Sequence, residues 1–245
     1  MTRFLIISIF IFVNQLSANN KDEKIFKNII SDYNIEKSVE NFQFTEEQSK
    51  KLCGENPISI DCEIKTIYVM NEITKKRILH LLNQISQKYN IDKKLVYKLN
   101  LKYLKYISKN QKVDQIVSYC VSSICYEKSI RDDLIHFENN LELILENNNI
   151  ESDNNINYEP LIKNIYEENL GSIEELKNNH EIEYKKMKNN FIDVYKSWND
   201  YETNLTLFLK KIKKNNFKWK EIFYKDRFNY LIRYKDFFED VKIKK

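Results

Sequence analysis

The chain has 245 residues but only two glycines and two prolines, too few for the tight turns of an all-β protein, so we expect an all-α fold. Hydrophobic residues make up 42% of the sequence, which is enough for a buried core. After the N-terminal segment no run approaches the roughly 18 apolar residues of a membrane helix, which excludes a transmembrane segment in the mature chain, and the formal net charge of +4 is small but unevenly distributed.

The first segment, residues 1–18, has the features of a secretory signal peptide. Arg3 supplies the charged start, Phe4 to Val13 form an apolar run that only Ser8 interrupts, and Ala18 is a small residue suited to the cleavage site. We therefore expect cleavage near Ala18 and a mature protein that is soluble and either periplasmic or secreted. An uncleaved N-terminal anchor is the alternative.

Residues 19–145 form the predicted N-terminal helical part, which contains all four cysteines. A short helix is expected around residues 25–35. The run Thr45-Glu46-Glu47-Gln48 then resembles a capping box, in which the first and last side chains satisfy each other's backbone N–H groups at a helix start. Gly54 follows Cys53, and because glycine commonly ends helices, this second helix is predicted to be brief.

The next two helices of this part are longer. Asn56-Pro57 predicts a helix start, with Asn as the cap and Pro at the first position, and apolar residues continue at helical spacing to Tyr89. Asp92 should cap the following helix, which we expect to break near Asn110. Another helix is predicted from Val113 to Leu145.

Residues 146–159 are predicted to form a loop, because six asparagines lie between Asn147 and Asn157 with few apolar side chains among them. The remaining part, 160–245, should pack on the N-terminal part. It is expected to open with a short helix that starts at Pro160 and ends at Gly171.

A long run without Gly or Pro, Ser172 to Lys214, predicts one central helix along which the others pack as an elongated antiparallel bundle. Ser172 and Glu175 have capping-box spacing, and at about 1.5 Å per residue the helix would be roughly 60 Å long. Its apolar and aromatic residues recur at steps of three or four: Ile173, Leu176, His180, Tyr184, Met187, Phe191, Val194, Trp198, Tyr201, Leu205, Phe208 and Ile212.

A last helix, from Phe217 to about Val241, mixes basic and aromatic residues. From Lys210 to Lys245 there are 13 basic and 5 acidic residues, a net charge of +8; because the mature chain carries +3, residues 19–209 carry −5. Two interpretations remain open, namely an aromatic core face with a solvated lysine face, or a surface for an anionic partner. Expected export argues against nucleic acid.

The cysteines form two near pairs, Cys53 with Cys62 and Cys120 with Cys125, and an oxidising compartment predicts two disulfides at helix junctions. Cys53 and Cys62 flank a predicted turn, where a local bridge is sterically easy. Cys120 and Cys125 can bridge only if their helix breaks near Ser122-Ser123, because five residues of helix separate the Cα atoms by too much. Cross-pairing between the two turns is the alternative.

No catalytic constellation stands out. The sequence has no Gly-rich phosphate loop, no G-x-S-x-G and no H-E-x-x-H, and acidic neighbours such as Asp132-Asp133 point in different directions on a helix. The three histidines, His80, His136 and His180, are scattered among apolar neighbours and do not cluster with cysteines. We therefore expect no enzyme activity, no cofactor and no metal site.

The segment DCEIKTIYVMNEITKKRILHLLNQISQKY resembles the LprI-type lysozyme-inhibitor family, as does a Trp-x-x-aromatic signature in the predicted central helix. The chain departs from the family pattern in having Ile73 after Met-Asn-Glu and Glu202 after the aromatic residue, and residues 90–171 separate the two signatures. The matching residues are Cys62, Met70, Asn71, Glu72, Leu82, Asn83, Tyr89, Trp198 and Tyr201.

The resemblance implies an exported helical protein that binds a lysozyme and blocks its sugar cleft. It also implies that Asn71 and Asn83 pair helices, and that Trp198 and Tyr201 hold the central helix against the Cys62 helix. The alternative function is a periplasmic interaction or immunity protein that binds another secreted toxin or an envelope component. In either case the expected partner is a protein.

Overall fold

The computed structural model describes residues 20–56, 58–117, 123–146, 156–175, 181–212 and 216–243. Within these ranges the protein is built of helices without β-strands, so the all-α prediction is confirmed. The predicted signal peptide, 1–18, and residues 147–155 of the predicted Asn-rich loop lie outside the described residues. No helix of the described part is both long enough and apolar enough to cross a bilayer.

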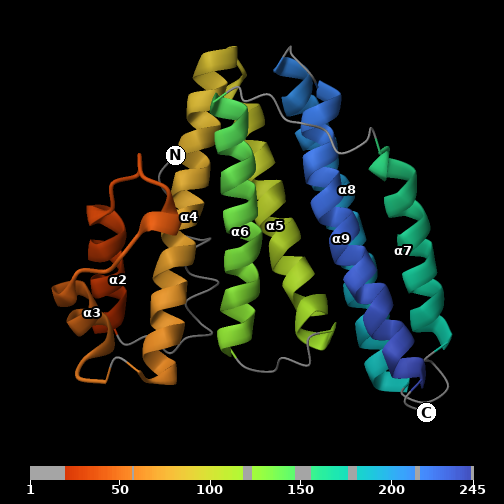
Figure 1. Ribbon diagram of the computed structural model, residues 1–245, viewed down its shortest axis with the longest axis horizontal. Coiled ribbons are helices and arrows are strands. Elements are labelled where there is room, and N and C mark those ends of the chain that lie inside the picture. Colours follow the sequence, from red (N-terminus) through yellow and green to blue (C-terminus); the bar gives the residue numbers. More distant parts are fainter. Residues whose placement is uncertain are drawn as a thin grey trace.

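The helices lie side by side as an elongated array, with α2 and α3 at one end and α7 at the other (Figure 1). In chain order they are α2 (Asn20–Asp32), the 3-10 helix η1 (Val39–Asn41), α3 (Glu46–Cys53), α4 (Ile60–Tyr89), α5 (Lys93–Val117), α6 (Ser123–Glu146), α7 (Tyr158–Glu175), α8 (Glu181–Lys211) and α9 (Asn216–Ile243).

Three helix pairs make the main contacts: α4 packs on α6, α5 on α8, and α7 on α9. The α5–α8 pair therefore joins the two halves of the array. Helices α6 and α9 lie in front of α5 and α8 respectively and contact each other only sparsely (Figure 1).

Local signals explain several helix ends. The Thr45 hydroxyl accepts from the Gln48 N–H at 3.2 Å and the Gln48 side chain accepts from the Thr45 N–H at 3.0 Å, so the predicted capping box is present. Gly54 ends α3 with φ of 63°, a conformation that favours glycine. Asp92 accepts from the Lys94 N–H at 2.8 Å at the start of α5. Helix α4 begins differently from the prediction, because Ser59 is its cap rather than Asn56.

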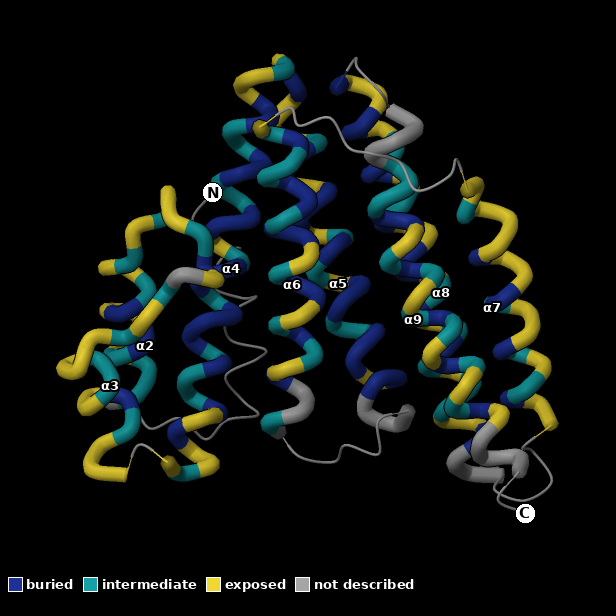
Figure 2. The backbone as a smooth tube through the Cα atoms, viewed as in Figure 1, coloured by how far each residue is buried: buried dark blue, intermediate teal, exposed yellow. Residues whose placement is uncertain are grey.

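Buried residues follow the inward faces of the helices, and exposed residues follow the outer faces (Figure 2). One large apolar cluster extends from α4 to α9. A second, smaller cluster fixes α2, η1 and α3 to the first half of α4; its buried members are Phe26, Ile29, Val39, Leu52, Val69, Met70 and Ile73.

The predicted central helix over 172–214 is wrong in its first part. Helix α7 continues through Gly171 and Ser172 to Glu175, and α8 begins only at Glu181. A glycine in an exposed helix position costs about 1 kcal/mol, and the packing of α7 on α9 outweighs that cost. The Asn169 side chain, fully buried, donates to the Leu231 carbonyl of α9 at 2.8 Å just before this glycine.

The predicted seam is nevertheless present on α8. Its described members from Tyr184 to Ile212 are buried, with Met187 partly buried. Positions 176–180, which include the predicted seam residues Leu176 and His180, lie outside the described residues. The helix is shorter than predicted, but the face that it buries is the predicted one.

The break predicted near Asn110 is also wrong. Helix α5 passes through this residue to Val117, and Asn110 is fully buried. Its side-chain oxygen accepts from the Tyr234 hydroxyl at 2.8 Å, which ties α5 to α9. In the sequence Asn110 suggests a turn, but in the structure it is a hydrogen-bonding residue of the core.

Candidate functional site

A cleft of about 370 Å³ opens between α6 and α9, above the packed pair α5 and α8. Its size falls in the range typical of small-molecule sites. Side chains of all four helices line it: Tyr103, Tyr106, Asp132, Asp133, His136, Phe137, Asn140, Trp198, Tyr201, Phe223, Asp226, Arg227, Asn229, Tyr230 and Arg233.

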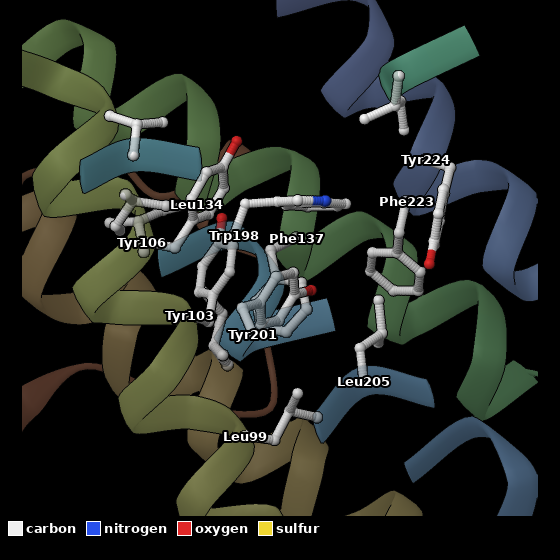
Figure 3. Close-up of a cluster of buried hydrophobic side chains, with 14 of the residues drawn as sticks. Leu99, Tyr103, Tyr106, Leu134, Phe137, Trp198, Tyr201, Leu205, Phe223 and Tyr224 are labelled. Atoms are coloured by element: carbon white, nitrogen blue, oxygen red, sulfur yellow. The ribbon is translucent and has the colours of Figure 1, made fainter. Parts of the chain in front are cut away.

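Aromatic rings from α5 and α8 form the floor of the cleft, and Figure 3 shows them gathered opposite Phe223 and Tyr224 of α9. The Tyr106 and Trp198 rings lie 5.3 Å apart between centroids, as do the Tyr103 and Tyr201 rings. Aromatic pairs at these separations add stability beyond their buried area. The floor is therefore a packed, rigid surface made of residues nearly 100 positions apart in the sequence.

Arg227 of α9 is a charged residue buried at this floor, with only 1% of its surface exposed. Its guanidinium lies 5.5 Å from the centre of the Tyr106 ring and 5.7 Å from that of Trp198, within range of cation–π attraction. Nη1 donates to the Tyr106 hydroxyl at 3.3 Å and to Asn110 at 3.4 Å. The other two nitrogens, Nε and Nη2, are buried and find no acceptor among the described residues.

Asp133 of α6 supplies a buried carboxyl group to the same cleft. Oδ1 accepts a hydrogen bond from the Tyr230 hydroxyl, whereas Oδ2 is buried without a hydrogen-bond donor in the described part of the chain. Burial raises the pKa of Asp133 from 3.8 to about 7, and the Tyr230 hydrogen bond only partly offsets this effect. The group therefore titrates near neutral pH.

A second polar network beside the cleft holds α5 against α9. Asp114 of α5 accepts from Arg233 and, at 3.2 Å, from the Tyr234 hydroxyl. Ser129 of α6 also donates to Asp114, at 2.5 Å. Arg233 thus has a carboxylate partner, whereas Arg227, six residues earlier, forms no ion pair within the described residues.

The mouth of the cleft is acidic. Asp132 and His136 are exposed on α6, and Asp226 faces them from α9. The Asn140 amide donates to Asp226 at 3.2 Å. Burial raises the pKa of Asp226, and the nearby His136 imidazole opposes this rise. Two carboxyl groups and one imidazole therefore border the entrance.

The structure places Cys53 and Cys62 at disulfide distance, with Cα atoms 4.7 Å apart at the junction of α3 and α4, where the sequence predicted a local bridge. Cys120 and the side chain of Cys125 lie outside the described residues. The second predicted disulfide therefore stays a prediction.

The residues of the predicted family motif serve mainly to pack helices. On α4, Cys62, Met70, Asn71 and Leu82 are buried. The Asn71 amide donates to Glu127 of α6 at 2.7 Å, which agrees with its expected role in pairing helices.

The other motif positions on α4 are partly exposed: Glu72, Asn83 and Tyr89. Glu72 forms an ion pair with Lys75 at 2.6 Å on the same helix, and the Tyr89 hydroxyl donates to the Ile144 carbonyl of α6 at 3.4 Å. The three positions do not meet in one site.

Trp198 and Tyr201 are buried as expected, but they do not hold α8 against the Cys62 helix. Both rings contact Tyr106 of α5, with centroids 5.3 and 5.9 Å away. The anchoring role that the resemblance implied is therefore wrong, because α5 lies between α8 and α4. These two residues form part of the floor of the cleft instead.

Sequence reasoning missed Arg227 and set Asp133 aside as one of a chance acidic pair, although a signal for each residue was present. Arg227 occupies a seam position on α9, three residues after Tyr224 and seven before Tyr234, where periodicity calls for an apolar residue. Asp133 likewise falls four residues before Phe137 on the buried side of α6. A charged residue in an apolar seam is the feature that would have identified both.

Comparisons of this chain with family models, with curated proteins and with solved structures found no match. Within the described ranges, no group of three or more His, Cys, Asp or Glu side chains could hold a metal ion. The groups that the cleft offers to a ligand include its aromatic rings, Arg227 and the carboxyl groups.

Proposed function

We propose that this protein is an exported helical binding protein that holds a small ligand in the cleft between α6 and α9. The observation that carries the proposal is the presence, in one cavity of about 370 Å³, of buried polar atoms without partners in the described chain. They belong to Arg227, Asp133 and Tyr201. Unpaired buried polar groups are costly, and a ligand that completes their hydrogen bonds would offset that cost.

The aromatic floor supports the same proposal. Most of the cleft lining near Trp198 and Tyr201 is apolar and held by ring-to-ring contacts, so a ligand would meet a preformed surface rather than one that must first become ordered. The carboxyl groups at the mouth would then disfavour ligands that carry several negative charges. Binding, rather than a chemical reaction, is the function that these features support.

Filling the cleft is the direct test. Asn229 lines the cleft and is exposed, so Asn229→Trp would place a large ring in it without removing a buried contact. We expect small flat probes such as indole and phenylacetate to perturb the NMR signals of residues lining the cleft in the wild type, and to lose this effect in the variant. Asn164→Trp, on the exposed side of α7, is the matched control and should bind as the wild type does. Equal binding by all three proteins would refute the proposed site.

A protein partner is the second candidate, and the outer face of α5 and α8 favours it. Tyr97, Leu101 and Leu207 are exposed large apolar side chains on this helix pair, with 43 to 47% of their surface accessible. The pair is antiparallel, because Lys102 contacts Asp200 at 2.7 Å and Lys109 contacts Asp193 at 2.9 Å.

The charge of this face limits which kind of protein partner can bind it. Lysines outnumber aspartates along it, with Lys98, Lys105 and Lys112 acting on the same two aspartates. The face therefore suits an acidic partner better than a lysozyme, since lysozymes are commonly basic. Lysozyme inhibition is the particular case of protein binding that the sequence resemblance implied, and it can be tested directly.

A lysis assay with muramidases of different classes tests whether the protein inhibits a lysozyme. The inhibitor hypothesis predicts a dissociation constant of about 1 μM or better, and Leu101→Asp should weaken inhibition if this face is the contact. Lys76→Asp on α4 is a control at an exposed position away from the face. Absence of inhibition by any lysozyme class at tens of micromolar protein, roughly tenfold above that constant, would reject it.

A further inference from the structure

We propose that the ligand of the cleft is a small aromatic carboxylate, whose carboxylate group pairs with the free edge of Arg227. The inference rests on the proposed function and adds the chemical class of the ligand. Three observations support this inference: the position of the guanidinium, the identity of its unpaired nitrogens and the charge of the surrounding walls.

The two unpaired nitrogens of Arg227 are the ones that a carboxylate matches best. Nε and Nη2 lie on the same edge of the planar guanidinium, and their N–H bonds run nearly parallel. A carboxylate can accept both at once in a bidentate pair, which is shorter and stronger than a single neutral hydrogen bond. Nη1, on the opposite side, already donates to Tyr106 and Asn110.

The charge of Arg227 gives a second reason. A buried guanidinium without a carboxylate partner is costly, and cation–π contacts with Tyr106 and Trp198 only partly offset the loss of water. The described chain forms no ion pair with it. The buried Arg77, by comparison, contacts both Glu138 and Glu142. A ligand carboxylate would give Arg227 the partner that Arg77 obtains from its own chain.

The rest of the ligand should be flat and small. The rings of Tyr106, Trp198 and Tyr201 form the floor beneath the guanidinium, and offset or edge-to-face contacts with them favour an aromatic body. Asp133 and Asp226 line the same cleft. Their presence disfavours a doubly charged phosphate, because each added negative charge would be repelled by these carboxyl groups.

Calorimetric titration of the purified protein with three probes tests the inference without any mutation. Phenylacetate should bind at least about tenfold more tightly than phenylacetamide, which has the same shape but no charge, and more tightly than phenyl phosphate. Equal affinities for the acid and the amide would overturn the carboxylate inference while leaving the cleft as a binding site. Tighter binding of phenyl phosphate would show that the preferred anion is a phosphate, which also overturns it. If none of the three binds at about 10 mM, the proposed function itself fails.

A pair of arginine variants assigns the effect to Arg227. Arg227→Lys keeps the charge but removes the two-pronged edge, so the preference for phenylacetate over phenylacetamide should fall severalfold. Arg131→Lys, on α6 outside the lining of the cleft, should keep the wild-type preference. Circular dichroism and thermal unfolding establish that both variants fold. An unchanged preference in folded Arg227→Lys would contradict the proposal, and if that variant does not fold, the three-probe series decides.

Discussion

Asp133 shows how burial in this fold changes the chemistry of a single residue. Its carboxyl group lies among Tyr103, Phe137 and Tyr230, and the Tyr103 hydroxyl donates to its backbone carbonyl. Little water reaches the group to stabilise its charge. The raised pKa of Asp133 follows from this environment and has a measurable effect on stability.

Asp133→Asn should stabilise the protein more at pH 8 than at pH 5.5. The folded-state pKa, about 7, lies above the usual 3.8, so the folded state holds the proton more tightly and wild-type stability falls as pH rises between these values. Ionised Asp133 should then cost about 2 to 4 kcal/mol at pH 8, and asparagine avoids this cost. Urea unfolding at both pH values measures the difference. The same change in unfolding free energy at pH 5.5 and pH 8 would contradict the assignment.

Trp198 is the second residue with a defined expected effect. Trp198→Ala should destabilise the protein by about 3 to 5 kcal/mol, because the ring is 96% buried and packs against Tyr106, Tyr201 and Tyr224. Lys196→Ala, two residues earlier and exposed, is the control. Denaturant unfolding of both variants gives the comparison. A loss below about 1 kcal/mol would mean that the floor of the cleft does not depend on this ring.

At the scale of elements, α4 connects the N-terminal helices to the rest of the array. One side of it buries the small cluster with α2, η1 and α3, and the other packs on α6. Two features reinforce these contacts, namely the Cys53–Cys62 pair and the ion pairs of Arg77.

The cysteine prediction concerns the junction of α3 and α4. In the oxidised protein, peptide mapping without reduction should link Cys53 to Cys62. Replacing both cysteines with serine should lower the unfolding free energy by about 2 to 4 kcal/mol, because the bridge restricts the unfolded chain. A peptide that joins Cys53 to Cys120 or Cys125 would contradict the local pairing.

Arg77 is the residue through which α4 holds both α6 and the segment before η1. Its Nε donates to Glu138 at 3.0 Å, and its other nitrogens donate to Glu142 and to the Ile35 carbonyl. Arg77→Met should cost about 3 to 5 kcal/mol, because fully buried Glu138 would lose its cationic partner.

Adding Glu138→Gln to this variant should recover part of the loss, since the uncompensated charge is then removed. Lys76→Met, at the exposed neighbouring position, is the control for the change in side chain. Additive effects of Arg77→Met and Glu138→Gln in thermal or urea unfolding would show that the two residues do not interact.

At the scale of the whole molecule, the basic and aromatic end of the chain belongs to the core. Within the described part of α9, Phe223, Tyr224, Tyr234 and Phe238 are buried. Lys220 contacts Glu159 and Lys235 contacts Glu168, at 3.1 and 2.8 Å. Of the two interpretations of this helix, the aromatic core face with charged residues at its borders is the one that its packing supports.

Export is the prediction that concerns the complete molecule. When the full chain is produced in a Gram-negative host, N-terminal sequencing of the purified protein should begin near Asn19, because residues 1–18 have the order of a signal peptide. The protein should be recovered from the periplasm or the medium. Recovery of the intact Met1 end in the cytosol would contradict the expected localisation.

Several local features could be predicted from the sequence alone. The all-α class, the capping box at Thr45, the helix end at Gly54 and the cap at Asp92 depend on side chains within a few residues of one another, so the chain determines them without reference to distant contacts. The buried seam of α8 could also be predicted, because helical periodicity is a local property.

Only the tertiary structure decided where helices continue and where the cleft lies. Asn110 and Gly171 are weak helix positions by local preference, but packing against α9 outweighs that preference at both. The contact between Asn110 and Arg227 joins residues 117 positions apart, and that between Tyr230 and Asp133 joins residues 97 apart. Sequence periodicity shows which face of a helix is buried, but not which helix covers it. A cleft forms where two helices fail to cover each other, so α6 and α9 acquire it only in the folded protein.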